Sequence, residues 1–485
     1  LYAHPTIAEL APCLRRQDTD RRKKVVERGA SLPVAPMQAR RLEGLSEAPR
    51  RYNQTIILRA SGALDAQAMR TALEFVVNHH EALRLAFRKD GGAWRQNGVS
   101  GGSVRLDVVN LENVTDAARE LARHADGLQA AHDPAEGRLI ASAIYRQCDG
   151  DRLLLSIHHF GIDAVSWNIL LEDLQHAYQA IRAGGTPDLK PSTSYLDWVA
   201  VLDGEAKAHS RDGERGYWSN VMSAAVQQIP VHDARAPNLS ADVAEVSFHV
   251  EAAISTALTS GANAAYRTTP EDLLIVALMR ALYRESGLLR LRIAVEGNGR
   301  ANDVGGLDIS RSVGWFTVIH PVVIDLPVQR DIGYQIRAIK EQLRAVPDNG
   351  VGYGRLRWMS AKEPATDLAG DLPILFNYLG RIGEAASRHG FAWDDALIGS
   401  DIDGALKRLH ELETSAMLIG SELRLVVRHS ARRVASSKAR ALVEAWGREI
   451  SAVVDFLVRD ATPRLTPSDL TYAGISLDDL ESIAS

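Results

Sequence analysis

The sequence has only two cysteines, Cys13 and Cys148, among its 485 residues. Two cysteines cannot build the disulfide framework of a small secreted domain, and they cannot supply a four-cysteine zinc site. Long apolar runs are missing as well: 273–279, one of the longest, falls far short of the ~20 residues that span a bilayer, and the first residues show no charged-then-apolar signal pattern. These absences predict a soluble protein of a reducing cytoplasm, with no membrane partner.

An excess of charge of one sign is also absent. The 56 Lys and Arg residues against 61 Asp and Glu residues give a formal net charge of −5. A nucleic-acid partner would need a concentrated basic surface, and the short basic run at 21–28 is more typical of a solvated linker. The hydrophobic fraction of 46% is ordinary for a globular protein, and the length predicts two lobes or domains.

Hydrophobic periodicity predicts alternating strands and helices from residue 32 onward. The expected strands are 54–58, 153–157, 290–295, 317–324 and 423–429. The expected helices are 65–78, 166–181, 270–283, 332–344 and 436–458. In the second of these helices, Ser166 is suited to cap the start, and Gly184 and Gly185 to close the end. The alternation predicts an α/β (α+β) fold with a sheet in each half.

Composition divides the chain into six expected segments. They are a short helix at 1–15, a basic linker at 16–30, a first lobe at 31–205, a polar connection at 206–240 containing Gly and Pro, a second lobe at 241–462 and a tail at 463–485.

Two adjacent histidines, His158 and His159, follow the strand expected at 153–157. Successive residues of a strand face opposite sides, so only one of the two rings can face a given cleft. Imidazole titrates near physiological pH, which suits proton transfer, although a bare pair of histidines is more often structural or merely exposed than catalytic. Asp163 follows across a Gly-containing turn. No second group of ligands accompanies it, so we expect no metal site.

Five ordered motifs resemble those of the condensation superfamily of non-ribosomal peptide synthetases, in its epimerization branch. The first, His158-His159-x-x-x-Asp163-x-x-Ser166-Trp167, has Ser-Trp where ordinary condensation domains usually carry Gly. The others are Glu296-Gly297-Asn298-Gly299-Arg300, Val313-Gly314-Trp315-Phe316-Thr317, the loop 347–354 (PDNGVGYG) and Phe376-Asn377-Tyr378-Leu379-Gly380. The resemblance covers about residues 30–475. It favours this reading of 296–300 over a dinucleotide loop, which would need a third glycine and a following helix.

The resemblance implies two lobes like chloramphenicol acetyltransferase, arranged in a V with the active-site tunnel between them. It implies that the chain binds no cofactor itself and that its substrate arrives on the 4'-phosphopantetheine of a carrier domain. Residues 1–10 (LYAHPTIAEL) resemble the end of a peptidyl carrier domain. The expected partners are therefore an upstream loaded carrier and a downstream condensation domain or module.

The implied reaction is epimerization, from L to D, at the α-carbon of an aminoacyl or peptidyl thioester. An α-proton beside a thioester is still a weak acid, so the reaction needs a base and donors that stabilise the enolate. Exchange on both faces favours two groups on opposite walls. By resemblance these catalytic groups are His159 and Glu296, and Glu296 suits the role if desolvation raises its pKa.

Supporting residues are also carried over from the motifs. We expect Asp163 to form a structural ion pair, with Arg300 as its partner. His158 and Ser166 support the site, and Trp167 and Trp315 pack around it or, for Trp315, line the tunnel. Asn377 and Tyr378 either position the aminoacyl group and bond the enolate, or form a turn after an apolar strand.

Two positions depart from the family pattern: Asn298 stands where the family usually has His, and His320 where Tyr is common. We expect both to line the tunnel, with His320 within reach of the site. Three other functions stay open: an amide-forming condensation domain, a free-standing acyltransferase, and an inactive carrier-docking scaffold.

Overall fold

The computed structural model describes residues 26–27, 29–101, 104–208, 212–300, 305–359, 365–382, 391–394, 396, 398–460, 462–470 and 474–484. The carrier-like helix expected at 1–15 and most of the linker expected at 16–30 lie outside these residues.

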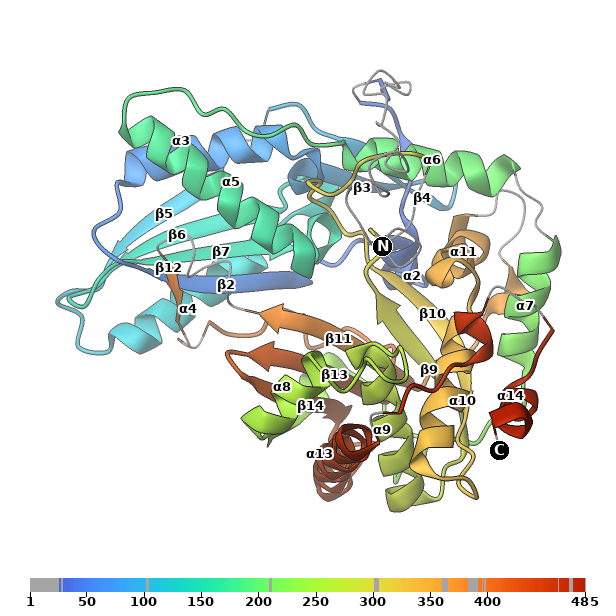
Figure 1. Ribbon diagram of the computed structural model, residues 1–485. Helices are drawn as coiled ribbons and strands as arrows, with labels where there is room; N and C mark the ends of the chain where they lie inside the picture. The colour runs from blue at the N-terminus through green and yellow to red at the C-terminus, as the bar shows by residue number, and fades with distance from the viewer. Residues whose placement is uncertain are drawn as a thin grey trace, which may run out of the picture.

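The first large sheet has the strand order β12-β2-β7-β6-β5, antiparallel except for the β5–β6 pair. Its strands are β2 (Asn53–Ala60), β5 (Arg105–Asn110), β6 (Ile140–Arg146), β7 (Arg152–His158) and β12 (Phe391–Trp393). Helices α3 (Ala66–His79) and α5 (Ala164–Arg182) pack together over one face (Figure 1), and α4 (Ala117–Ala130) packs against the other. A smaller sheet beside it joins β1 (Leu32–Pro33), β4 (Ala93–Gly98) and β3 (Leu85–Asp90).

The second large sheet has the order β10-β9-β11-β13-β14-β8, in which β11 runs parallel to both of its neighbours. Its strands are β8 (Val243–Val250), β9 (Arg290–Gly297), β10 (Val318–Asp325), β11 (Ile374–Ile382), β13 (Leu412–Ile419) and β14 (Glu422–Ser430). Its helices are α8 (Ala252–Thr259), α9 (Pro270–Ser286), α10 (Ile332–Arg344) and α13 (Ser436–Arg459).

One face of this second sheet is apolar, because alternate residues of its strands enter a large core with the helices. In β9 these residues are Leu291, Ile293 and Val295, all nearly inaccessible to solvent. Glu296 follows Val295, so its side chain lies on the opposite face, away from the helices.

A further core cluster joins helices from both halves of the chain. They are α2 (Pro36–Leu42), α6 (Tyr195–Ala208), α7 (Asp212–Ser223), α11 (Val351–Gly354) and the adjoining π-helical turn Arg355–Met359. A last helix, α14 (Leu477–Ala484), lies near the end of the chain (Figure 1). Among the helices in the described ranges, none is both long and apolar enough to cross a membrane.

The expected α/β fold with two sheets is confirmed, and the helix at 332–344 has the predicted bounds. The structure adds two features to this picture. The polar connection expected at 206–240 contains helix α7. Strand β12, whose residues lie within the range 241–462 expected for the second lobe, pairs with β2 in the first sheet.

Candidate functional site

His159 stands where β7 ends and a 3₁₀ turn, His159–Gly161, begins. Its ring is half-buried beside two aromatic rings, both stacked on it, which also neighbour each other. The centroid of the imidazole lies 4.2 Å from that of Trp315 and 5.3 Å from that of Tyr52. Stacking of this kind holds the imidazole in one plane.

Both nitrogens of His159 have partners. Nδ1 lies 2.9 Å from the carbonyl oxygen of Ile162, and Nε2 lies 3.1 Å from Nε2 of Gln54. Burial lowers the pKa of His159 below its ordinary value, so the ring is neutral at pH 7.

His158 has a different environment from its neighbour. It is fully buried, its Nε2 donates to the carbonyl of Pro49 at 2.8 Å, and its Nδ1 accepts from the backbone N–H of Phe160. Burial lowers the pKa of His158 to about 3. As the strand alternation predicted, the two rings have different environments. His159 is half-buried, whereas His158 is buried and its hydrogen bonds stabilise the turn.

Asp163 and Arg300 form the ion pair that the sequence predicted. Nη2 of Arg300 lies 3.1 and 3.3 Å from the two carboxylate oxygens, and both side chains are about 6% exposed. Asp163 also accepts the backbone N–H of Ser166, so it caps α5; the expectation that Ser166 is the cap was wrong. The Asp163 carboxylate can cap the helix because its backbone is extended there.

Ser166 links the two halves instead. Its Oγ accepts a hydrogen bond from Nη2 of Arg300 at 2.8 Å. The same Oγ donates to the carbonyl oxygen of Gly314 at 2.9 Å and lies 3.1 Å from the backbone nitrogen of Gly314. The guanidinium of Arg300 lies 4.2 Å from the centroid of Phe316, and the backbone N–H of Phe316 donates to Asp163. This buried network connects the start of α5 with the segment 314–316. It thereby fixes the position of Trp315, which stacks on the His159 ring.

Glu296 is half-buried near the end of β9, paired across the sheet with Ile319 of β10 and Asn377 of β11. Among the described residues it has no hydrogen-bond partner. Burial raises the pKa of Glu296 to about 7, the positive charge of Arg40 opposes the rise, and the negative charges of Glu413 and Asp163 add to it. A carboxyl group with this pKa can both accept and donate a proton near neutral pH.

Two interactions connect Glu296 with the His159 side. The charge of Glu296 raises the pKa of Tyr52, the residue that stacks on His159. The charge of Asp163 acts on both candidate groups, raising the pKa of each. The two residues that the sequence singled out therefore belong to one neighbourhood, built from β7 and β9 in different sheets.

Asn377 and Tyr378 are separated by the sheet. Asn377 pairs in parallel register with Glu296, so the two side chains share a face. Tyr378 faces the other side and packs against the helix-covered core, where burial raises its pKa. The structure brings Asn377 to the site and leaves Tyr378 away from it.

The two departures from the family pattern have different environments. Asn298 is exposed, and its Oδ1 accepts the backbone N–H of Arg300 in a local turn. His320 pairs with Val295, so its side chain lies on the face of the sheet opposite to Glu296. There it contacts Gly350, and its ring centroid lies 6.1 Å from that of Trp218. The expectation that His320 lies within reach of the site was wrong, because the strand register turns it away.

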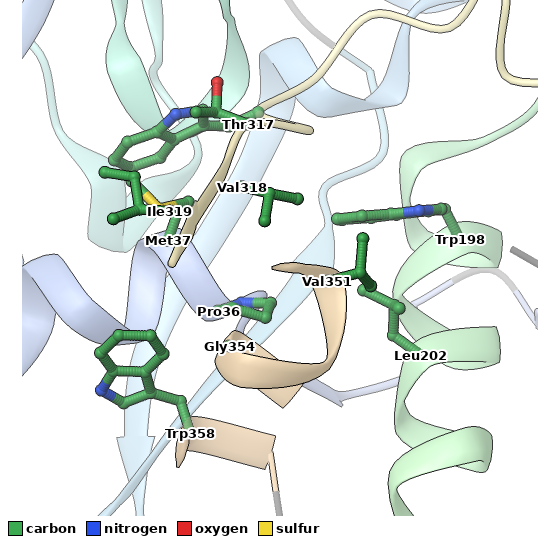
Figure 2. Close-up of a pocket in the computed structure, with 11 residues that line it drawn as sticks. Pro36, Met37, Trp198, Leu202, Thr317, Val318, Ile319, Val351, Gly354 and Trp358 are labelled. Atoms are coloured by element: carbon green, nitrogen blue, oxygen red, sulfur yellow. The ribbon is translucent and has the colours of Figure 1, made fainter. Parts of the chain in front are cut away.

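Two cavities flank helix α2. The first is an apolar pocket with room for about one water, about 20 Å³, in which Trp315 and Ile319 meet Met37 and residues of α6 and α11 (Figure 2). The second measures about 760 Å³ and is walled by polar groups. Arg40, which lines it, lies 3.0 Å from Nε2 of His410 and is the residue whose charge lowers the pKa of Glu296.

One potential metal cluster occurs among the described residues, His79, His80 and Asp173. Nε2 of His80 already contacts Asp173 at 2.9 Å, and Arg311 pairs with the same carboxylate. An arginine at the carboxylate disfavours a cation, so this cluster is a buried ion-pair network on α3 and α5.

Sequence reasoning missed Tyr52, Gln54 and Arg40. For Gln54 a signal existed: in β2 it alternates with Ile56 and Leu58, so it falls on the buried face, where a polar group needs a partner. Tyr52 and Arg40 gave no such signal, because their neighbours at the site come from distant segments.

Comparison with known proteins decides the family. The family model described as the condensation domain matches residues 30–399. The chain belongs to the condensation domain family. Domains of this family carry no cofactor of their own, and their substrate is carried on a partner's phosphopantetheine arm.

Relatives and solved structures agree with this assignment. The whole chain aligns at 29% identity with 9% of bacitracin synthase 1 of Bacillus licheniformis, and at 29% identity with 14% of tyrocidine synthase 2 of Brevibacillus parabrevis. The chain thus spans only a small part of the length of these curated relatives.

The solved structures share the fold. The epimerization domain from the third module of tyrocidine synthetase B aligns with a TM-score of 0.82 and 28% identity, covering 90% of this chain and 99% of that one. The condensation domain from Monacolin K polyketide synthase MokA aligns with a TM-score of 0.70, 16% identity and coverage of 89% and 98%.

Proposed function

We propose that this domain epimerises the α-carbon of an aminoacyl or peptidyl group held as a phosphopantetheine thioester on a carrier domain. The observation that carries the proposal is the carboxyl of Glu296, half-buried, without a hydrogen-bond partner among the described residues and with a pKa raised to about 7. The similarity to an epimerization domain at 28% identity supports the same reaction.

The proposed chemistry is a proton exchange with no net redox change. One group removes the α-proton, the electron pair of the C–H bond enters the thioester as an enolate, and a second group returns a proton to the opposite face. Glu296 is present in both protonation states near pH 7, and neutral His159 can accept a proton. Asn377, on the face of Glu296, is the side chain best suited to hydrogen-bond the enolate oxygen.

The test uses a carrier domain loaded with an L-aminoacyl group deuterated at Cα. Incubation with the protein in ordinary water is followed by release of the amino acid and measurement of deuterium loss and the D/L ratio. We expect washout with a D/L mixture, and loss of both in Glu296→Gln and His159→Ala. His249→Gln is the matched control, because that side chain is 61% exposed on β8, at the edge of the second sheet opposite β10.

Amide formation is a second candidate, favoured by the family model that matches the chain. A condensation domain would leave the deuterium in place and join the aminoacyl group to a second loaded carrier. Product analysis by mass spectrometry in the same assay separates the two reactions. If neither reaction occurs with several amino acids and a short peptide, the result favours a carrier-docking scaffold.

A further inference from the structure

Gln54 in β2 contacts His159 and the start of α5 through one side-chain amide. The indole Nε1–H of Trp167 donates to Oε1 of Gln54 at 2.7 Å. The amide nitrogen of Gln54 lies 3.1 Å from Nε2 of His159. An indole nitrogen can only donate a hydrogen bond, so Trp167 fixes the amide with its oxygen toward the indole and its NH₂ toward the imidazole.

The partners of His159 then define one tautomer. The carbonyl of Ile162 can only accept, so Nδ1 carries the ring proton. Nε2 keeps its lone pair and accepts an N–H of Gln54. Every group in the chain from Trp167 to Ile162 has a complementary partner, which is the condition for a single stable arrangement.

We propose that Gln54 and Trp167 are positioning residues that hold His159 in its Nδ1–H tautomer and oppose protonation at Nε2. A proton at Nε2 would face the NH₂ of Gln54. Relief would need a half-turn of the amide, which would then turn its NH₂ against the indole N–H of Trp167. The catalytic consequence rests on the proposed epimerization: Nε2 takes up a proton only in exchange for the hydrogen bond of Gln54, so the imidazolium returns promptly to the neutral state.

Other charged and titratable groups around the ring do not supply this preference. Tyr52 stacks on one face, with Arg41 5.3 Å from the Tyr52 ring and Glu296 acting on the Tyr52 pKa. His158 is neutral at pH 7. Asp163 favours the charged imidazolium, but its carboxylate is committed to Arg300 and to the α5 cap.

The experiment records nitrogen chemical shifts of the full chain labelled with ¹⁵N-histidine as a function of pH. The His159 signals are assigned by their loss in His159→Gln. Trp167→Phe keeps an aromatic ring and removes the N–H. Trp198→Phe is the matched control, because Trp198 is also buried but its Nε1 has no hydrogen-bond partner among the described residues.

We expect a neutral Nδ1–H signal for His159 at pH 7 in the wild type and in Trp198→Phe. In Trp167→Phe, and in Gln54→Leu, the titration midpoint moves to higher pH and the tautomers mix. Gln54→Glu, which places an acceptor at Nε2, gives a protonated ring at pH 7. An Nε2–H tautomer in the wild type, or a Trp167→Phe spectrum like that of the wild type, would overturn the proposal.

Activity is measured separately with the deuterated carrier substrate. We expect the rate in Trp167→Phe to fall by about tenfold, roughly the effect of one hydrogen bond, with a shifted pH profile. A merely structural role would lower the melting temperature and leave the His159 spectrum unchanged. Absence of exchange in the wild type contradicts the proposed function, while the spectra still decide the positioning role.

Discussion

Glu296 and Asn377 lie directly opposite each other on adjacent parallel strands, so a carboxyl and an amide share one face of the second sheet. The next residue along β11, Tyr378, faces the core on the other side. Asn377 and Tyr378 are neighbours in one sequence motif, but they lie on opposite faces of the sheet.

Substitutions of Asn377 and of Tyr378 should therefore have unequal effects on the rate of D/L interconversion. We expect Asn377→Ala to lower the rate of D/L interconversion by about a hundredfold, because removal of an enolate-stabilising donor costs on the order of 10²–10³ in rate. Tyr378→Phe should stay within about twofold of the wild type. Initial rates with the deuterated carrier substrate measure both. Equal losses in the two variants would contradict the assignment of Asn377 alone to the site.

The pH dependence of the reaction should follow Glu296. Its pKa of about 7 places an inflection of the rate near neutral pH. Arg40 lowers that pKa, so Arg40→Gln should move the inflection upward. Glu413 raises it, so Glu413→Gln should move the inflection downward. Single-turnover rates measured from about pH 5.5 to about pH 8.5 test the opposite signs, and shifts in the same direction would exclude Glu296 as the titrating group.

Much of the fold followed from sequence because it is local. Hydrophobic periodicity predicted the major strands and helices, and strand alternation predicted that His158 and His159 would have different roles. The ion pair of Asp163 with Arg300 was also predicted, from the motif resemblance. What failed was non-local: the face of His320 depends on the register of β10 against β9, and the role of Gln54 depends on a helix more than a hundred residues away.

The ion pair between Asp163 and Arg300 should matter for stability as well as activity. Asp163→Ala leaves a buried guanidinium without its counter-charge, which typically costs about 3–5 kcal/mol of unfolding free energy. Urea unfolding measures the loss. A double-mutant cycle with Arg300→Met should show strong coupling, with the double variant less destabilised than the sum of the single variants. Additive effects would mean that the pair contributes little beyond packing.

Acid should destabilise the protein through its buried histidines. The pKa of His158 is lowered to about 3 in the folded state, against 6.5 for an ordinary histidine, so between these values the unfolded chain binds a proton that the folded chain does not. The contribution of His158 to the free energy of unfolding is therefore fully present above pH 6.5. It declines as pH falls toward 3, by up to about 1.4 kcal/mol per pH unit for one such group.

His132 and His320, with pKa values lowered to about 4, add to the same slope. Urea unfolding should show a free energy of unfolding that falls from about pH 7 to about pH 5. His158→Gln should reduce the slope of this free energy against pH by the contribution of about one bound proton. His249→Gln is the control, because that ring is 61% exposed and should leave the slope unchanged. His320→Gln gives a second test where His158→Gln does not fold. Equal slopes in the wild type and both buried variants would show that other groups take up the protons on acid unfolding.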